Sequence, residues 1–132
     1  MDEAERQRLL TTHGNRSDAE ETIRNITACS LPSTIFERTV DDNLRSSDLA
    51  WRAWLNHGSR EDILAAMSNV AVPVLVVAGA ADAAMTEEIL EQHVVRCLTV
   101  ASMKVTPNAG HLLPLEVPEA IADLIRGEVK HF

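Results

Sequence analysis

The sequence lacks clusters of basic residues and long uninterrupted apolar runs. Its 12 Lys and Arg residues are scattered singly among 20 Asp and Glu residues, which gives a formal net charge of -8. Because phosphate binding needs clustered positive charge, we expect no nucleic-acid partner. The longest apolar run, from Val70 to Ala81, contains Pro73 and is far shorter than the roughly 20 residues that a membrane-spanning helix needs. We therefore expect a soluble protein with no membrane partner.

Signals for export and for metal binding are also missing. Met1 to Arg6 is acidic and polar where a secretory signal would be basic and then apolar, so a cytoplasmic location is the expectation. Two cysteines, Cys29 and Cys97, allow at most one disulfide, and we expect both to be reduced and buried. His93 and Cys97 would share a helix face, but two ligands do not make a closed zinc site. We expect no metal and no cofactor.

Helical signals fill the first half of the chain. At 132 residues the sequence can form one domain or one incomplete domain. Ser17-Asp18-Ala19-Glu20 and the weaker Ser59-Arg60-Glu61-Asp62 are capping boxes, which predict helix starts. A further helix begins at Ser47 and ends at Gly58, because glycine favours the C-terminal end of a helix. Residues 1–68 are therefore predicted to be a helical segment of four or five short helices.

Strands and helices alternate in the second half. Val72 to Ala78 is a run of mostly β-branched residues, typical of a strand buried on both faces of a parallel sheet. Met103 to Thr106 is predicted to be a second, short strand. Thr86 begins the helix between the two strands, and Pro118 begins the last helix. Residues 69–132 thus predict an α/β fold with the order strand, helix, strand, helix, which favours parallel strands.

The predicted sheet of two parallel strands is incomplete. Parallel sheets are normally covered on both faces, and their unpaired edges attract other strands. We therefore expect the missing strands to come from a second copy of the chain, from a different polypeptide, or from a larger domain of which this sequence is a truncated piece. The first case predicts a homo-oligomer such as a dimer. The second predicts a complementing chain that carries the earlier strands.

Two loop residues are candidates for chemistry. Asp82 follows the first predicted strand, and His111 follows the second, at the strand ends where functional groups collect in open α/β sheets. Gly110 permits an unusual backbone conformation that would project the imidazole. Asp82 alone could merely cap a turn, and His111 alone could bind a backbone carbonyl. Their matched positions favour a carboxylate that holds an imidazole for general-base work on a serine.

The segments that carry these residues, Val72 to Asp82 and Asn108 to Glu119, resemble the end of α/β-hydrolases of the esterase and carbon-carbon hydrolase type. In that family a G-x-x-D aspartate follows the seventh strand and an A-G-H histidine follows the eighth. The resemblance implies a partial α/β-hydrolase fold in which Asp82 is the triad acid and His111 the base. It also implies that residues 1–68 are a helical cap.

The same resemblance implies a small ester as the substrate. Trp51 and Trp54 of the cap-like segment, together with Leu112 beside the histidine, are the candidate substrate-binding residues. Such residues line apolar pockets for acyl or alcohol groups. The alternative for the two tryptophans is simple core packing.

The chain departs from the family at the nucleophile. A G-x-S-x-G elbow needs two glycines four residues apart, and no two of Gly14, Gly58, Gly79, Gly110 and Gly127 have that spacing. The nearest approach is Gly58-Ser59, but Glu61 stands where the second glycine is needed. His13-Gly14 superficially matches an oxyanion-hole dipeptide, yet it follows a charged helical stretch.

These absences leave two hypotheses. Triad members act as a unit, so the acid and the base alone predict little specific catalysis by the isolated chain. The chain is either part of a truncated or split ester hydrolase, or a noncatalytic module derived from one that oligomerises through its strand edges.

Overall fold

The computed structural model describes residues 1–129, and the chain forms two compact units. The first, the helical unit, consists of Met1–Asn25 and Pro32–Ile63. The second, the sheet unit, consists of Ile26–Leu31 together with the chain from Leu64 onward. Segment Ile26–Leu31 therefore belongs to a different unit from the helices that flank it in sequence. The function of residues 1–68 as a cap stays a prediction.

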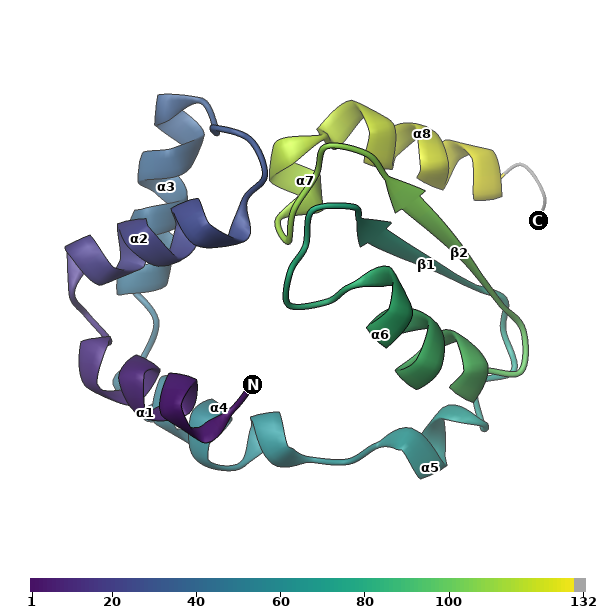
Figure 1. Cartoon of the computed structure of the whole chain (residues 1–132), viewed down its shortest axis with the longest axis horizontal. Helices are drawn as coiled ribbons and strands as arrows, with labels where there is room; N and C mark the ends of the chain where they lie inside the picture. The colour runs from purple at the N-terminus through teal and green to yellow at the C-terminus, as the bar shows by residue number, and fades with distance from the viewer. Residues whose placement is uncertain (130–132) are drawn as a thin grey trace. The chain divides into compact units, whose positions relative to one another are not determined.

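Five helical elements make up the helical unit (Figure 1). They are α1 (Glu3–Thr12), α2 (Arg16–Ile26, whose last residue joins the sheet unit), α3 (Ser33–Leu44), α4 (Asp48–Asn56) and the 3-10 turn η1 (Gly58–Arg60). The core of this unit is small, with Ile23, Val40 and Leu55 as its largest buried apolar side chains. The predicted helical character of the first half of the chain is confirmed.

The N-terminal caps of two helices are as the sequence predicts. The hydroxyl of Ser47 accepts a hydrogen bond from the amide of Ala50 at the start of α4 (3.5 Å). The hydroxyl of Thr86 accepts one from the amide of Ile89 (3.3 Å). Both bonds satisfy an amide that has no partner within its own helix.

The two capping boxes predicted at Ser17 and Ser59 are wrong. Helix α2 begins at Arg16, because the side chain of Asn15 accepts the amide of Ser17 at 2.9 Å and takes the capping position two residues earlier. Ser59 lies in η1, where its hydroxyl donates to the carbonyl of Leu55 (3.2 Å) instead of capping a later helix. Asparagine competes well with serine for the cap, which sequence spacing alone does not reveal.

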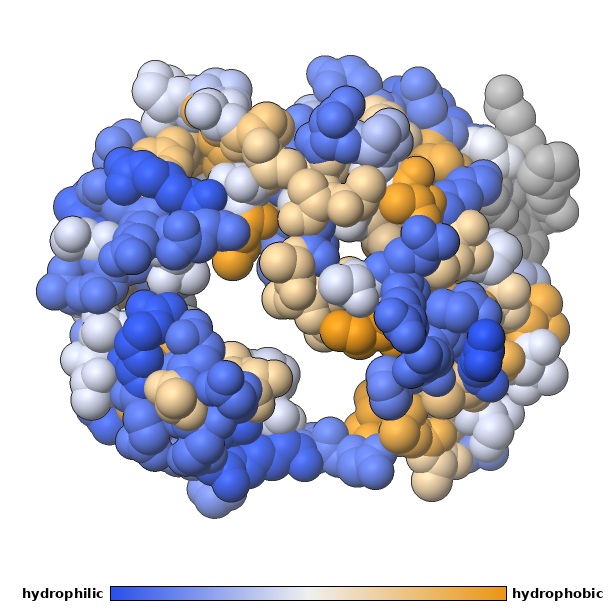
Figure 2. Space-filling model, in the orientation of Figure 1, coloured by the Kyte–Doolittle hydropathy of each residue, from blue (hydrophilic) through white to orange (hydrophobic). Residues whose placement is uncertain are grey.

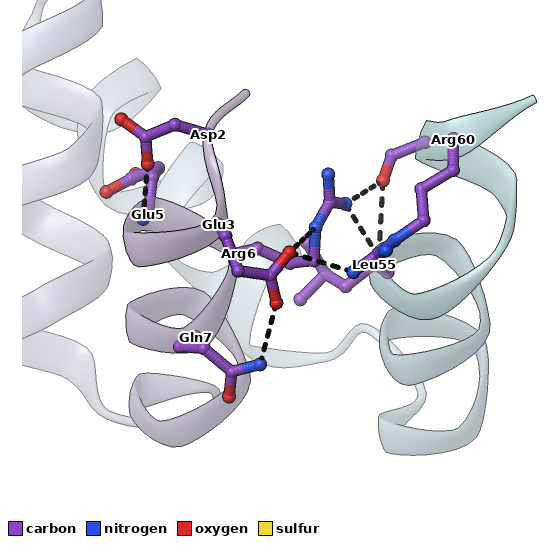
Figure 3. Close-up of polar contacts among 8 residues, drawn as sticks. Asp2, Glu3, Glu5, Arg6, Gln7, Leu55 and Arg60 are labelled. Carbon is purple, nitrogen blue, oxygen red and sulfur yellow. Dashed lines mark hydrogen bonds and ion pairs between the residues drawn. The ribbon is translucent and has the colours of Figure 1, made fainter.

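A buried arginine joins the two ends of the helical unit's sequence (Figure 3). The guanidinium of Arg6, only 6 % exposed, donates to the carbonyl oxygen of Leu55 at 2.7 Å and to the hydroxyl of Ser59. Its Nε atom also pairs with Glu3 at 3.3 Å, and Glu3 in turn binds Arg60. A guanidinium is tolerated in a protein interior only when its donors find such partners. These bonds fasten α1 to α4 and η1.

The sheet unit contains two strands that pair in parallel (Figure 1). Its elements are α5 (Leu64–Met67), β1 (Val74–Gly79), α6 (Glu87–His93), the 3-10 turn η2 (Val95–Cys97), β2 (Ala101–Thr106), α7 (Leu113–Glu116) and α8 (Pro118–Val129). The register runs from Val74 opposite Ala101 to Gly79 opposite Thr106. Helices α6 and α8 lie on either side of the strands in Figure 1. The predicted α/β fold and its parallel strands are confirmed.

Strand β1 begins two residues later than predicted. Pro73 has no amide hydrogen and cannot donate to the neighbouring strand. Val74 has one, and its amide donates to the carbonyl of Val100 at 3.0 Å. The pairing therefore starts at Val74, immediately after the proline.

The expectation that β1 is buried on both faces is wrong for this chain. Residues 74–77 are only half-buried, and only Ala78 and Gly79 are buried. In the part of the chain that the structure describes, each strand has a single neighbour, so one edge of each stays unpaired. Figure 2 shows apolar surface (orange) at several places on this unit. Its exposed large apolar residues are Leu64, Val72, Met85, Ile89, Val100, Val105, Leu115 and Ile125.

The two cysteines are free, but the predicted burial of both is wrong, because Cys29 is exposed and Cys97 is only half-buried. Helix α2 ends at Ile26, so Cys29 lies in the following loop, where its side chain is exposed. Helix α6 ends at His93, and Cys97 lies in η2. The prediction that these two residues share a helix face is therefore wrong. Among residues 1–129, no helix has both the length and the apolar character needed to cross a bilayer.

Candidate functional site

The ends of the two strands bring Asp82 and His111 together. Because β1 and β2 are parallel and in register, the loops that follow them start at the same edge of the sheet. There the Nδ1 atom of His111 lies 2.7 Å from Oδ2 of Asp82, within hydrogen-bond distance. The two residues are 29 positions apart in sequence. Their meeting follows from the register of the strands.

The carboxylate of Asp82 is almost fully occupied by hydrogen bonds. Its Oδ1 atom accepts from the amides of Ala84 (2.9 Å) and Met85 (3.0 Å), while Oδ2 faces the imidazole. The side chain is only 8 % exposed. Burial raises the pKa of Asp82, but the hydrogen bonds from His111, Met85 and Ala84 outweigh it, so the pKa lies below its ordinary value. The carboxylate is therefore ionised at neutral pH.

The imidazole of His111 is held on one side and open on the other. Because an ionised carboxylate can only accept a hydrogen bond, Nδ1 must donate to Asp82, and in the neutral imidazole Nε2 then carries the lone pair. The side chain is 44 % exposed, and within the described residues Nε2 has no hydrogen-bond partner. This arrangement leaves one basic nitrogen available to a group that approaches from outside the loop.

The loops that carry Asp82 and His111 are in direct backbone contact. The amide of Ala81 donates to the carbonyl of Ala109 at 2.9 Å, and the amide of Ala80 donates to the carbonyl of Thr106 at 2.9 Å. A Cβ atom on Gly79 would lie 2.2 Å from the carbonyl oxygen of Gly110, a distance that no side chain tolerates. Gly79 is therefore required for the close approach of the two loops.

Gly110 serves a different purpose from the one predicted. Among the described residues only Gly14 and Asn108 have a positive φ, so Gly110 does not adopt the unusual conformation expected of it. A Cβ atom there would lie 2.6 Å from the carbonyl oxygen of Ile26 and 2.8 Å from the amide nitrogen of Ala28. Its role is to let the segment Ile26–Leu31 pack against the histidine loop. The unusual conformation belongs to Asn108, with φ of 56°.

Glu116 was given no role by the sequence analysis, although it lies within the segment that carries the resemblance. Its carboxylate accepts hydrogen bonds from the backbone amides of Gly110, Leu112 and Ala28. Only tertiary contacts reveal this, because Ala28 is 88 positions away in sequence. The one sequence feature that could have indicated this role is the acidic residue five positions after the histidine.

The other predicted site residues lie in separate surroundings. Leu112 directly follows His111 and is half-buried, as expected for a residue beside the imidazole. Trp51 belongs to the helical unit, where it stacks on His13 with ring centroids 5.0 Å apart and donates to the carbonyl of Leu9 at 3.0 Å. Trp54 is 55 % exposed and packs one edge against Gly58. Their binding of substrate stays a prediction.

No protein-family model matches this sequence, and no curated protein sequence matches it. Solved structures do match. An esterase from Exiguobacterium antarcticum matches 98 % of this chain with a TM-score of 0.86 at 17 % identity. A thermophilic esterase from Thermogutta terrifontis matches 97 % with a TM-score of 0.76 at 25 % identity.

A third match names its fold. An α/β-hydrolase enzyme from a Medee basin deep-sea metagenome library matches 94 % of this chain with a TM-score of 0.68 at 20 % identity. This chain has part of the α/β-hydrolase fold. The resemblance seen in the sequence is thus confirmed for the fold of the chain. The chain spans about half the length of these three proteins, 49 %, 49 % and 48 % in the order given.

Proposed function

We propose that this chain supplies the acid, Asp82, and the base, His111, of a site that hydrolyses small carboxylic esters. The observation that carries the proposal is the 2.7 Å contact between the two side chains, with Nε2 of His111 left open. The likeness to esterases supports the class of reaction. Residues 1–132 contain no G-x-S-x-G motif, so the proposal places the serine on polypeptide outside this sequence.

The chemistry follows from the tautomer that Asp82 imposes. Nε2 of His111 takes the proton of the serine hydroxyl while its oxygen attacks the ester carbonyl, and the imidazolium then gives that proton to the departing alcohol. In the second half-reaction Nε2 takes a proton from water as the water attacks the acyl-enzyme. The imidazolium then returns that proton to the serine oxygen as its bond to the acyl group breaks, which releases the acid. Asp82 remains ionised throughout and stabilises the transient imidazolium.

A complementation experiment tests this proposal. The chain is co-expressed with the half of the Exiguobacterium antarcticum esterase that it does not match, and hydrolysis of 4-nitrophenyl acetate is measured. We expect the complex to be active and His111→Ala to lower kcat at least about 1,000-fold, because the removal of a triad member has effects of this order. His93→Ala, which changes an exposed histidine of the same unit, is the control and should keep the rate.

Two outcomes contradict the proposal. One is a folded complex without any hydrolysis of the ester. The other is hydrolysis that His111→Ala leaves unchanged, since the activity would then not pass through this imidazole.

A noncatalytic module that binds a second copy of the chain is the other candidate function. The unpaired edges of β1 and β2 and the exposed apolar residues of the sheet unit favour it. Open strand edges attract other strands, and a symmetric dimer is the simplest way to cover them. Light scattering of the chain at micromolar concentration tests this. A dimer is expected, and a folded monomer contradicts it.

A further inference from the structure

Glu116 makes an unusual set of contacts for a half-buried carboxylate, because all of its short hydrogen bonds come from the backbone. Oε2 accepts from the amide of Ala28 at 2.7 Å, and Oε1 accepts from the amide of Leu112 at 3.0 Å. The amide of Gly110 lies between the two oxygens, at 3.1 Å from Oε1 and 3.0 Å from Oε2. Three amides from two segments thus converge on one side chain.

These amides surround the histidine. Gly110 and Leu112 are the residues immediately before and after His111, and both donate to Glu116. The amide of His111 itself donates to the carbonyl of Ile26 at 2.7 Å. Three consecutive amides are therefore fixed, and the direction of the imidazole follows from a backbone that cannot rotate freely.

An ionised carboxylate suits this task better than any neutral side chain. It offers two oxygens with about four lone-pair positions and no donor, and its bonds to amides are assisted by its charge. A glutamine of the same shape would offer one oxygen, and its NH₂ group would face at least one amide donor. Helix α7 sets the direction of the Glu116 side chain. Its single turn brings Glu116 back toward Leu112, the residue immediately before the helix.

We propose that Glu116 is the positioning residue for His111. Its carboxylate binds the histidine loop to the segment Ile26–Leu31, and this holds Nδ1 against Asp82 and keeps Nε2 open. The effect of this positioning on ester hydrolysis rests on the proposed function. The positioning of His111 does not rest on it, because it can be measured without any hydrolysis.

The test is nuclear magnetic resonance on the full chain, with Glu116→Gln as the main variant. Ring nitrogen shifts of His111 report which nitrogen carries the proton. In the parent chain we expect the Nδ1–H form to dominate, and in Glu116→Gln we expect the Nε2–H form to increase at least threefold. Hydrogen exchange at the amides of Gly110, Leu112 and Ala28 should become at least about tenfold faster, while exchange in β1 stays unchanged. Glu119→Gln, a change at an exposed glutamate three residues later, should alter neither.

Glu116→Asp distinguishes the effect of the carboxylate's charge from the effect of the side chain's length. The shorter side chain keeps the charge but reaches fewer amides, so we expect values between those of the parent and Glu116→Gln. Amides that exchange faster in Glu116→Gln while the His111 ring stays in its Nδ1–H form overturn the proposal. Glu116 would then only support the loop.

Glu116→Asp also covers the case in which Glu116→Gln does not fold. Hydrogen exchange at the amides of Gly110, Leu112 and Ala28 should then be faster than in the parent chain, and the Nε2–H form of His111 should increase with it. Faster exchange without that change in the imidazole refutes the inference. If these results hold but His111→Ala leaves ester hydrolysis unchanged, the proposed function fails and the positioning role stands.

Discussion

Gly79 and Gly110 approach so closely that a methyl group on Gly79 would overlap the carbonyl oxygen of Gly110. One glycine ends β1 and the other precedes His111, so this contact sets how near the acid loop lies to the histidine loop. Overpacking in a close contact costs typically about 1–3 kcal/mol, and here the neighbour is backbone, which cannot turn aside as a side chain can. The pairing of Asp82 with His111 depends on it.

Gly79→Ala should therefore destabilise the sheet unit by about 2 kcal/mol or more and lengthen the distance between Asp82 and His111. Urea unfolding measures the first effect, and the ring nitrogen shifts of His111 report the second. Gly127→Ala is the control, because a Cβ atom at that helical position meets nothing within 4 Å. It should stabilise α8 by roughly 0.5–1 kcal/mol. Equal stability of the two variants would contradict the close contact.

Arg6→Ala should make the helical unit easier to unfold, because the carbonyl of Leu55 loses one of its two donors and the hydroxyl of Ser59 loses the guanidinium that donates to it. The expected loss in free energy of unfolding is roughly 1.5–3 kcal/mol, the range for hydrogen bonds that involve a charged group. Arg52→Ala removes an exposed arginine that pairs with Asp48 within α4, and it should change stability by less than about 0.5 kcal/mol. Urea unfolding followed by tryptophan fluorescence compares the two. A similar small loss in both variants would show that the Arg6 bonds contribute little.

Low pH should decrease the stability of the sheet unit, because it protonates Asp82. The pKa of this carboxyl is lowered in the folded chain, so the ionised form stabilises the fold at a pH above the unfolded value of about 3.9. That stabilisation is lost as pH falls through the lower, folded pKa. We expect the free energy of unfolding to differ between the parent and Asp82→Asn at pH 7 and the difference to shrink below about pH 4.

Unfolding in urea at several pH values between 7 and 3 measures this difference. Asp123→Asn, which changes a carboxyl at the exposed surface of α8, is the matched control. A gap between parent and Asp82→Asn that stays constant down to pH 3 would show that the carboxylate gains nothing from its hydrogen bonds.

The exposed thiol of Cys29 should react faster with Ellman's reagent than the half-buried thiol of Cys97. Greater access to the sulfur of Cys29 favours its reaction with the reagent. We expect a fast and a slow phase of one thiol each, with rates at least about tenfold apart. Cys29→Ser should abolish the fast phase and leave the slow one. If Cys97→Ser removes the fast phase instead, the exposure of Cys29 is incorrect.

Local sequence signals predicted those features that depend on neighbours along the chain. The run of β-branched residues before Gly79 predicted a strand, and Thr86 predicted the start of the next helix. The meeting of Asp82 and His111 could be inferred because residues at the ends of paired parallel strands must come close. Each of these inferences needs only a periodicity, a cap or the order of the elements.

Features that depend on distant segments could not be read in this way. The purpose of Gly110 depends on the carbonyl of Ile26, and the contacts of Glu116 depend on the amide of Ala28. Both partners lie more than 80 positions away and leave no trace in local patterns. The exposure of Cys29 likewise follows from where α2 ends, at Ile26, and not from a local pattern around the cysteine.

The loops that carry Asp82 and His111 are joined through main-chain atoms of Ala80, Ala81 and Ala109, and the side chains of Ala80 and Ala81 are exposed. Main-chain bonds do not depend on which side chain a residue carries, except that proline has no amide hydrogen to donate. Substitution of these two alanines by residues other than proline should therefore preserve the spacing of carboxylate and imidazole, so the loop surface can be changed for a new substrate while the proton-transfer pair stays in place.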